Sequence, residues 1–411
     1  MDSKLLILVT NYYPYFRGEE YLETEIDFLC KRYTRILIIP TMVNQNMKMT
    51  RFTPENVDIL DIKVDLDIRN KIRFLFSKTN NNPMLKKNAT SIGKLMYQKY
   101  FENRANYVFN LINKQLNEII IDYTQIDIYS YWLYITARVS IQIKEYLLSN
   151  GSPVNRIVSR AHRYDLYENE SLLNYLPERE YLLSNLDEVF VCSKDGSDHL
   201  KSYHPGYDNK ISISYLGVDS GNFSPERKSG NNIIVSCSGI RKVKRLNLLI
   251  AGLQELERKN ISYKWYHFGN GKDYEKITKL AKRKLKQENF EFMGSVSNQS
   301  LKEWYDNSNV DIFINVSSSE GAPVSIMEAM ARGIPIIATD VGGTREMIDG
   351  NGILLPKNIS PKAISCAIEK VLNSDNYEQI SIKSYEIWNL VFNSNKNYKY
   401  FSKSIGCSNI D

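Results

Sequence analysis

Short apolar runs alternate with amphipathic segments along almost the whole chain. The runs have the length of buried strands, and the segments between them repeat apolar residues at helical intervals, as at 107–120 and 246–259. Such alternation predicts an α/β fold whose parallel sheets are covered on both faces. The expected strands are residues 4–10, 35–41, 127–134, 156–162 and 188–193 in the first half, and 232–239, 264–269, 290–294, 310–317 and 334–340 in the second.

A polar stretch, SPERKSGNN at residues 224–232, separates two complete alternating halves. We therefore expect two doubly wound Rossmann-like domains facing a cleft, an N-terminal domain of residues 1–222 and a C-terminal domain of residues 223–385. Residues 386–411 have a helical pattern, and we expect them to pack back toward the N-terminal domain. Doubly wound sheets bind ligands beyond the carboxyl ends of their strands, so the cleft is the expected site.

The composition, 43% hydrophobic and 24% charged, is that of a globular protein. We expect neither a membrane span nor a signal peptide, because no run of eighteen apolar residues exists and the first run stops at Asn11 without a cleavage site. Five scattered cysteines argue against a disulfide framework and a zinc site. They favour a reducing compartment, so we expect a cytoplasmic protein.

The positive charge is unevenly distributed. Residues 68–104 carry nine Lys or Arg and one Glu, interleaved with aromatic and aliphatic residues. Such a segment can contact an anionic membrane peripherally, or it can be a solvated loop and helix near a cleft. We expect no nucleic acid partner, because no recognisable binding module accompanies the charge.

Candidate chemistry is concentrated in SSSEGAPVSIMEAM, where a loop leads from a strand into a helix. Glu320 lies in the loop and Glu328 lies inside the helix. Gly321 allows close approach of a ligand, and the helix N-terminus favours an anion. Glu320 can accept hydrogen bonds from hydroxyls, and Glu328 can bridge the two vicinal hydroxyls of a ribose. The ligand that fits is a nucleotide sugar.

The stretch EGAPVSIMEAMARGIPIIATDVGG resembles the signature of the retaining glycosyltransferases of family 4, which have the GT-B fold. Both have two glutamates separated by seven residues, with Gly and Pro among the seven, then an Ala-x-Gly-x-Pro strand and an Asp-x-Gly-Gly turn. ILLP at 353–356 and YLGVD at 215–219 also resemble family elements. The resemblance covers essentially the whole chain, closely from 233 to 356 and loosely before 150.

The resemblance implies a function. It predicts retaining transfer of a sugar from a nucleotide-sugar donor to a glycan or lipid-linked acceptor in surface polysaccharide biosynthesis, without a metal or any other cofactor. Two alternatives stay open: a nucleotide-sugar epimerase of the same fold, and a non-catalytic nucleotide-sugar-binding protein.

The resemblance also implies roles for particular residues. Lys244 falls on the family's phosphate-contacting lysine, and Arg241 or Arg245 is a candidate for a second positive charge because the usual position holds Gly239. His162 follows a strand in the first domain and is assigned with Glu320 to catalysis, with Arg160 as a helper. The remaining expected donor-binding residues are Gly18, whose neighbour Glu19 replaces a second glycine, Val296 near the nucleobase, and Gly321, Ala322, Pro323, Val324 and Glu328.

Overall fold

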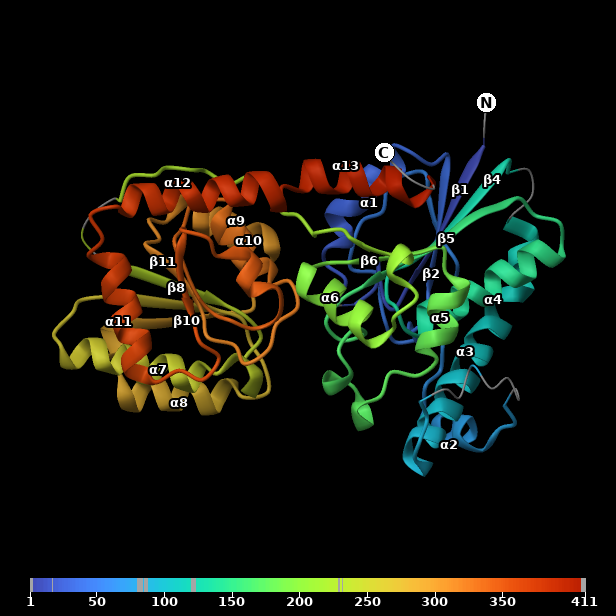
Figure 1. Ribbon diagram of the computed structural model, residues 1–411, viewed down its shortest axis with the longest axis horizontal. Coiled ribbons are helices and arrows are strands. Elements are labelled where there is room, and N and C mark those ends of the chain that lie inside the picture. Colours follow the sequence, from blue (N-terminus) through green and yellow to red (C-terminus); the bar gives the residue numbers. More distant parts are fainter. Residues whose placement is uncertain are drawn as a thin grey trace. The chain divides into compact units, whose positions relative to one another are not determined.

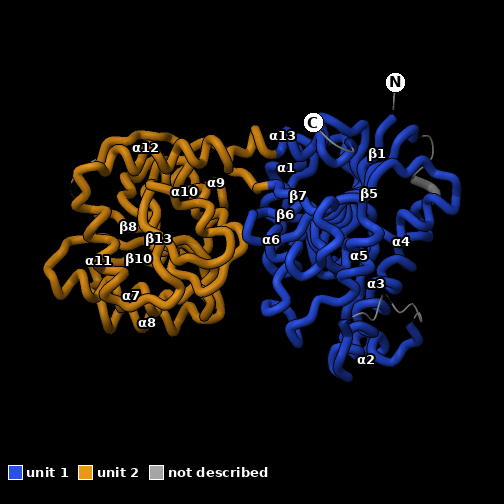
Figure 2. The backbone as a smooth tube through the Cα atoms, in the orientation of Figure 1, with its two compact units in different colours: residues 1–214, 398–411 blue, residues 215–397 orange. Residues whose placement is uncertain are grey.

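The computed structural model describes residues 3–16, 18–79, 84, 88–119, 123–227, 230 and 232–407. The chain divides into two compact units, shown in Figures 1 and 2. Unit 1 comprises residues 1–214 and 398–411, and unit 2 comprises residues 215–397. The boundaries expected at 222/223 and 385/386 both fall inside unit 2.

Unit 1 is built on a seven-stranded parallel sheet of order β3-β2-β1-β4-β5-β6-β7. The strand order reverses between β1 and β4, which are neighbours in the sheet. This is the doubly wound arrangement expected from the sequence. The strands are β1 (Lys4–Thr10), β2 (Arg35–Pro40), β3 (Val57–Ile59), β4 (Gln125–Ser130), β5 (Val154–Ala161), β6 (Glu188–Val191) and β7 (Ile211–Ile213).

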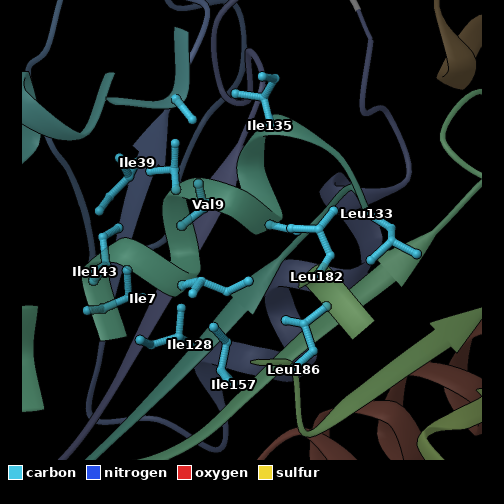
Figure 3. Packing of buried hydrophobic residues seen from close by; sticks show 14 of the residues in the cluster. Ile7, Val9, Ile39, Ile128, Leu133, Ile135, Ile143, Ile157, Leu182 and Leu186 are labelled. Atoms are coloured by element: carbon cyan, nitrogen blue, oxygen red, sulfur yellow. The ribbon is translucent and has the colours of Figure 1, made fainter. Parts of the chain in front are cut away.

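Alternate residues of β1 are buried on opposite faces of this sheet, because side chains alternate along a strand. Ile7 and Val9 join the cluster of Figure 3, which includes Ile135 and Ile143 of α4. Leu6 and Leu8 lie in the opposite cluster, with residues of α1 and of the end of α13. The helices of this unit are α1 (Leu22–Cys30), α2 (Ile68–Phe76), α3 (Ile92–Ile119), α4 (Ile135–Ser149), α5 (Arg179–Asn185) and α6 (Lys194–Tyr203).

Unit 2 is built on a six-stranded parallel sheet of order β10-β9-β8-β11-β12-β13. Its strand order reverses between β8 and β11, so the α/β prediction of two doubly wound sheets is confirmed. The strands are β8 (Ile233–Cys237), β9 (Lys264–Phe268), β10 (Phe290–Gly294), β11 (Ile312–Asn315), β12 (Ile336–Thr339) and β13 (Gly352–Leu355). The helices are α7 (Leu246–Arg258), α8 (Tyr274–Lys284), α9 (Asn298–Asn307), α10 (Val324–Met330), α11 (Pro361–Leu372), α12 (Tyr377–Ile387) and α13 (Ser394–Ile405), the last of which continues into unit 1.

The helical segment near the C-terminus is interrupted, which the sequence pattern did not predict. A π-helical turn follows α12, and Asn393 is extended before α13 begins. There the chain pairs with Val218, whose N–H donates to the Phe392 carbonyl at 2.9 Å and whose carbonyl accepts from Ser394 N at 3.1 Å. A Cβ at Gly217 would lie 2.5 Å from Ser394 Cα, so this crossing requires glycine.

Candidate active site

The loops that follow β8 and β11 bring Lys244 and Glu320 into contact. Lys244 Nζ donates a 2.6 Å hydrogen bond to Glu320 Oε1. The Ser318 N–H donates to the Val243 carbonyl at 2.8 Å and joins the two loops. β8 and β11 are neighbours where the strand order of unit 2 reverses, the position at which doubly wound sheets bind ligands.

A chain of polar contacts fixes the Glu320 carboxylate. Asn315, the last residue of β11, donates to Glu320 Oε1 at 3.0 Å. Asn315 Oδ1 in turn accepts from the N–H and the hydroxyl of Ser317 at 3.0 and 2.5 Å. Sequence reasoning missed Asn315 and Ser317, although a polar residue at the end of the apolar run IFIN was a usable signal.

Glu320 is a buried carboxylate that stays ionised. Burial alone would raise its pKa, but the Lys244 ammonium and the hydrogen bonds from Lys244, Ser317 and Asn315 outweigh burial and lower the pKa below its ordinary value. An ionised carboxylate only accepts hydrogen bonds. The arrangement is therefore chemically suited to hydroxyl groups.

The Arg245 side chain supports this loop by hydrogen bonding to main-chain carbonyls. Its guanidinium donates to the carbonyls of Val316, Ser317 and Lys357 at 2.6, 2.9 and 2.7 Å. All three of its nitrogens are thereby engaged. We therefore assign Arg245 to holding the end of β11, whereas the sequence interpretation placed it on the donor.

The Asp-Val-Gly-Gly turn packs directly against the Glu320–Gly321 peptide. Gly342 has a φ of +54°, and a Cβ there would lie 2.0 Å from the Glu320 carbonyl oxygen. The Gly343 N–H donates to the Gly321 carbonyl at 2.9 Å. Glycine is thus required at position 342 for both backbone conformation and space.

Helix α10 begins at Val324, with Pro323 as an extended residue before it. The sequence interpretation placed Pro323 in the first helical turn. Gly333, with a φ of +70°, lies in the left-handed conformation expected after the helix. Gly321 and Ala322 remain half-buried, and the side chains of Pro323 and Val324 are buried.

Glu328 lies in the second turn of α10 and is only 6% exposed. Its Oε1 accepts a 3.2 Å hydrogen bond from Asn298, the first residue of α9. Burial raises the pKa of Glu328, while the charges of Lys302 and Arg332 and the Asn298 hydrogen bond act against that rise. No hydrogen bond to Oε2 is found in the described part of the chain, and this oxygen is not sealed from solvent, so it is available to a ligand.

Val296 lies in the loop between β10 and α9, two residues before Asn298, and is 40% exposed. Asn298 therefore links the Val296 loop to the Glu328 carboxylate. The structure thus brings Lys244 to Glu320, and the loop carrying Val296 to Glu328, at the carboxyl edge of one sheet.

His162 belongs to unit 1 and follows β5 directly. Its N–H donates to Asp165 Oδ1 at 2.7 Å, and its ring lies 4.8 Å from the Tyr131 ring and 4.7 Å from the Trp132 ring. Burial and the Arg160 charge lower the pKa of His162 to about 3. The imidazole is therefore uncharged at neutral pH.

Gly18 and Glu19 follow β1 in unit 1. Gly18 has a φ of +99° and open space where a Cβ would stand. Glu19 is buried, and its carboxylate accepts from the N–H groups of residues 11–13 at 2.7–2.8 Å and from Trp132 Nε1 at 2.7 Å. The glutamate in place of a second glycine therefore organises its own loop, which the sequence pattern did not indicate.

Arg160 lies in the core beneath the sheet edge and acts on His162 through its charge. It is fully buried, with Nη2 3.1 Å from Glu25 Oε2 and the guanidinium 3.9 Å from the centre of the Phe401 ring. Phe401 lies on α13 and belongs to unit 1. Arg160 therefore anchors the returning helix in the core.

Both the sequence and the fold are similar to those of known proteins. Residues 220–386 match the family model of glycosyl transferases group 1. The chain is 26% identical over 212 residues to the putative colanic acid biosynthesis glycosyltransferase WcaL of Escherichia coli (strain K12), covering 49% of this chain and 52% of the relative. It is 32% identical over 127 residues to the O-antigen biosynthesis glycosyltransferase WbnH of Escherichia coli, covering 31% and 35%. The chain thus spans about half the length of the first of these curated relatives, and less of the second.

Solved structures are similar over nearly the full chain. A sucrose-phosphate synthase from Thermosynechococcus elongatus superimposes with a TM-score of 0.70 at 13% identity, covering 97% of this chain and 98% of the other. Anabaena HepE in complex with UDP and glucose gives 0.64 at 16% identity, covering 98% and 99%. At these identities the likeness shows the fold. The chain therefore has the GT-B fold, and its residues 220–386 match the model of the glycosyl transferases group 1 family.

Proposed function

We propose that the protein is a retaining glycosyltransferase that moves a sugar from a nucleotide-sugar donor to a glycan or lipid-linked acceptor in surface polysaccharide biosynthesis. The observation that carries this proposal is the Lys244–Glu320 pair at the strand-order reversal of unit 2. Relatives named for colanic acid and O-antigen biosynthesis support the pathway. A likeness to HepE, solved with UDP and glucose, favours a UDP-sugar donor.

Each charged group has a proposed task on the donor. Glu328 Oε2 accepts from a ribose hydroxyl, and Glu320 accepts from hydroxyls of the transferred sugar. Lys244 shares its ammonium between Glu320 and the diphosphate and stabilises the charge that develops as the diphosphate leaves. Because a lysine supplies this charge, we propose that transfer needs no metal.

The sugar transfer itself is proposed to proceed by attack of the acceptor hydroxyl on the same face from which the diphosphate leaves. A phosphate oxygen takes the acceptor proton, the anomeric carbon–oxygen bond to phosphate breaks, and a new bond forms to the acceptor oxygen. Glu320 Oε1 is already engaged by Lys244 and Asn315, which favours an orienting role over a nucleophilic one.

We also propose that unit 1 contacts an anionic membrane. α3 has 28 residues, hence a length of about 42 Å, whereas the longest strand of the sheet, β5, has 8 residues and spans about 26 Å. The buried core residues of α3 start at Phe101, so its first turns extend beyond the sheet, beside α2 (Figure 1). None of the described helices is long and apolar enough to cross a bilayer.

This corner of unit 1, α2 with the first turns of α3, combines apolar and basic side chains. On α2, Phe74 packs against α3 while Ile68, Ile72 and Phe76 repeat every fourth residue and are 52–76% exposed. Ile92, Leu95 and Met96 on α3 are also exposed. The basic side chains of this corner are Arg69, Lys71, Arg73, Lys78, Lys94 and Lys99, whereas Arg104 is buried, and residues 80–83 and 85–87 lie outside the described residues. Apolar anchors among cations suit the interface of an anionic leaflet.

Incubation with UDP-, GDP- and ADP-sugars, with and without chelator, tests the enzymatic proposal. We expect one donor to release its nucleotide, by slow hydrolysis without acceptor and faster with acceptor, and the chelator to have no effect. Mass and NMR analysis of the sugar then decides between the alternatives. An epimerised donor would replace the transferase by an epimerase, and no turnover with any donor would favour a binding protein.

A further inference from the structure

Arg104 is a buried arginine without a protein partner among the described residues. It is 8% exposed, and its Nε is sealed from solvent with no acceptor. Its two terminal nitrogens are not sealed, so they face solvent. The guanidinium is therefore aimed at an opening.

The other buried arginines of the described part of unit 1 are all compensated. Arg138 and Arg160 pair with Glu178 and Glu25 at 2.8 and 3.1 Å, and Arg156 pairs with Glu188. Arg179 donates to the carbonyls of Leu133 and Asp165 at 2.9 and 2.5 Å. Arg104 therefore differs from the other described buried arginines of unit 1, because its terminal nitrogens remain open to an anion from solvent.

Contacts along α3 place Arg104 near the carboxyl edge of the sheet. Tyr97, Phe101 and Arg104 share one helix face by their spacing. The hydroxyl of Tyr97 bonds that of Tyr134, and the rings of Phe101 and Tyr134 lie 4.9 Å apart. The Tyr134 ring is 5.6 Å from that of Tyr164. Because Tyr134 follows β4 and Tyr164 follows β5, this cluster lies where those strands end.

The charge of Arg104 reaches three of the surrounding phenols. Burial raises the pKa values of Tyr12, Tyr134 and Tyr164, and the Arg104 charge acts against that rise in each. Tyr12 is half-buried in the loop that also holds Glu19, and Tyr164 is 52% exposed. Hydroxyl donors from the loops after β1 and β5 therefore stand near one free cation.

We propose that Arg104, together with the hydroxyls of Tyr12 and Tyr164, binds an anionic group of the acceptor, either a phosphate or a sugar carboxylate. A guanidinium binds both groups through paired N–H donors. The identification of the ligand as the acceptor rests on the proposed function, whereas the anion site stands on the buried cation alone.

Calorimetric titration with pyrophosphate and with glucuronate tests the site. The titrations use Lys244→Gln protein, which removes the cation proposed for the donor diphosphate in unit 2. We expect one of the two probes to bind this protein, and the one that binds identifies the group. Adding Arg104→Gln should weaken binding at least about tenfold, because a charge-assisted pair is lost.

Two further variants make the result decisive. Arg69→Gln removes an exposed arginine from α2 and should leave anion binding unchanged. This control distinguishes a specific anion site at Arg104 from non-specific electrostatic attraction of the anion to the basic residues 68–104. Arg104→Lys keeps the charge and should retain part of the affinity. It also serves if Arg104→Gln fails to fold, since a melting curve reports folding independently.

Binding of neither probe, or equal binding to the Arg104→Gln and Arg69→Gln proteins, would overturn the proposal. That failure is distinct from failure of the proposed function, because nucleotide release from the donor alone does not involve Arg104. When an acceptor is present, Arg104→Gln should raise the KM for the acceptor. The rate of donor hydrolysis without acceptor should stay unchanged.

Discussion

Lys244 and Glu320 are 76 positions apart in the chain, and their ammonium and carboxylate lie 2.6 Å apart. The pair is formed because parallel strands β8 and β11 are neighbours and both loops leave the same edge of the sheet. The Lys244 ammonium acts against burial and helps to lower the pKa of the Glu320 carboxyl before any ligand arrives. This preorganisation is what a site needs to act on a diphosphate leaving group.

We predict that Glu320→Gln reduces kcat by roughly 100-fold while changing donor affinity much less. The amide keeps the shape but loses the charge that strengthens contacts to the sugar as the glycosidic bond breaks. Steady-state kinetics of nucleotide release, with donor affinity measured separately, provides the test.

Glu303→Gln is the matched control, because Glu303 is an exposed glutamate on α9 in the same unit. It should behave as the unaltered protein. If Glu320→Gln and Glu303→Gln have the same kcat, Glu320 has no part in the reaction.

A second prediction concerns Glu328. Its raised pKa means that ionisation is harder in the folded chain than in the unfolded one. The stability cost is absent below the ordinary value of 4.5 and grows as pH rises through the folded-state pKa. Glu328→Gln should therefore raise the melting temperature more at pH 8 than at pH 4.

The same substitution should weaken nucleotide binding about tenfold, because a charge-assisted hydrogen bond to the ribose is lost. Melting curves and nucleotide titrations across this pH range measure both effects. A variant that is less stable at pH 8, or that binds nucleotide as tightly as before, contradicts this account of Glu328.

Removing one partner of the buried pair of Glu25 and Arg160 should destabilise unit 1. Glu25→Gln leaves Arg160 charged in the core, at a cost of about 3–5 kcal/mol. Urea unfolding should show this loss, and the exposed control Glu55→Gln should show none. A loss below about 1 kcal/mol would mean that the Phe401 ring and neighbouring phenols suffice to hold the cation.

The membrane proposal predicts salt-sensitive binding to vesicles that contain phosphatidylglycerol and none to pure phosphatidylcholine. Ile72→Ser with Phe76→Ser should lower the bound fraction about tenfold, because two exposed apolar anchors are removed. Leu390→Ser in unit 2, 78% exposed, is the control. Co-sedimentation without salt dependence, or equal loss with the control, would refute a specific contact.

Sequence patterns predicted most of the strands, because buried parallel strands are short apolar runs that are easily recognised. They predicted β1 and β10 residue for residue. β3 and β7 have three residues each and carry too little pattern to be seen. The strand expected to reach Tyr134 ends at Ser130, because residues 131–134, three of them aromatic, form the following turn.

Only part of the candidate site could be predicted from the sequence, because local patterns place residues relative to strand ends but do not show which distant loops meet. Motif spacing identified Glu320, Glu328 and Lys244, since their positions relative to strand ends follow from the chain itself. The hydrogen bonds of Glu19 to its own loop and to Trp132, and the lack of a partner for Arg104 among the described residues, depend on contacts between distant segments. No local sequence pattern indicates such contacts. Alternation along β5 likewise did not reveal that Arg160 points into the core.

The structure of the protein with a bound nucleoside diphosphate tests the central claim most directly. We predict that the diphosphate contacts the Lys244 ammonium and that a ribose hydroxyl lies about 2.5–3.0 Å from Glu328 Oε2. A nucleotide bound elsewhere, with Lys244 still paired to Glu320 and no ligand at Glu328, would contradict the account.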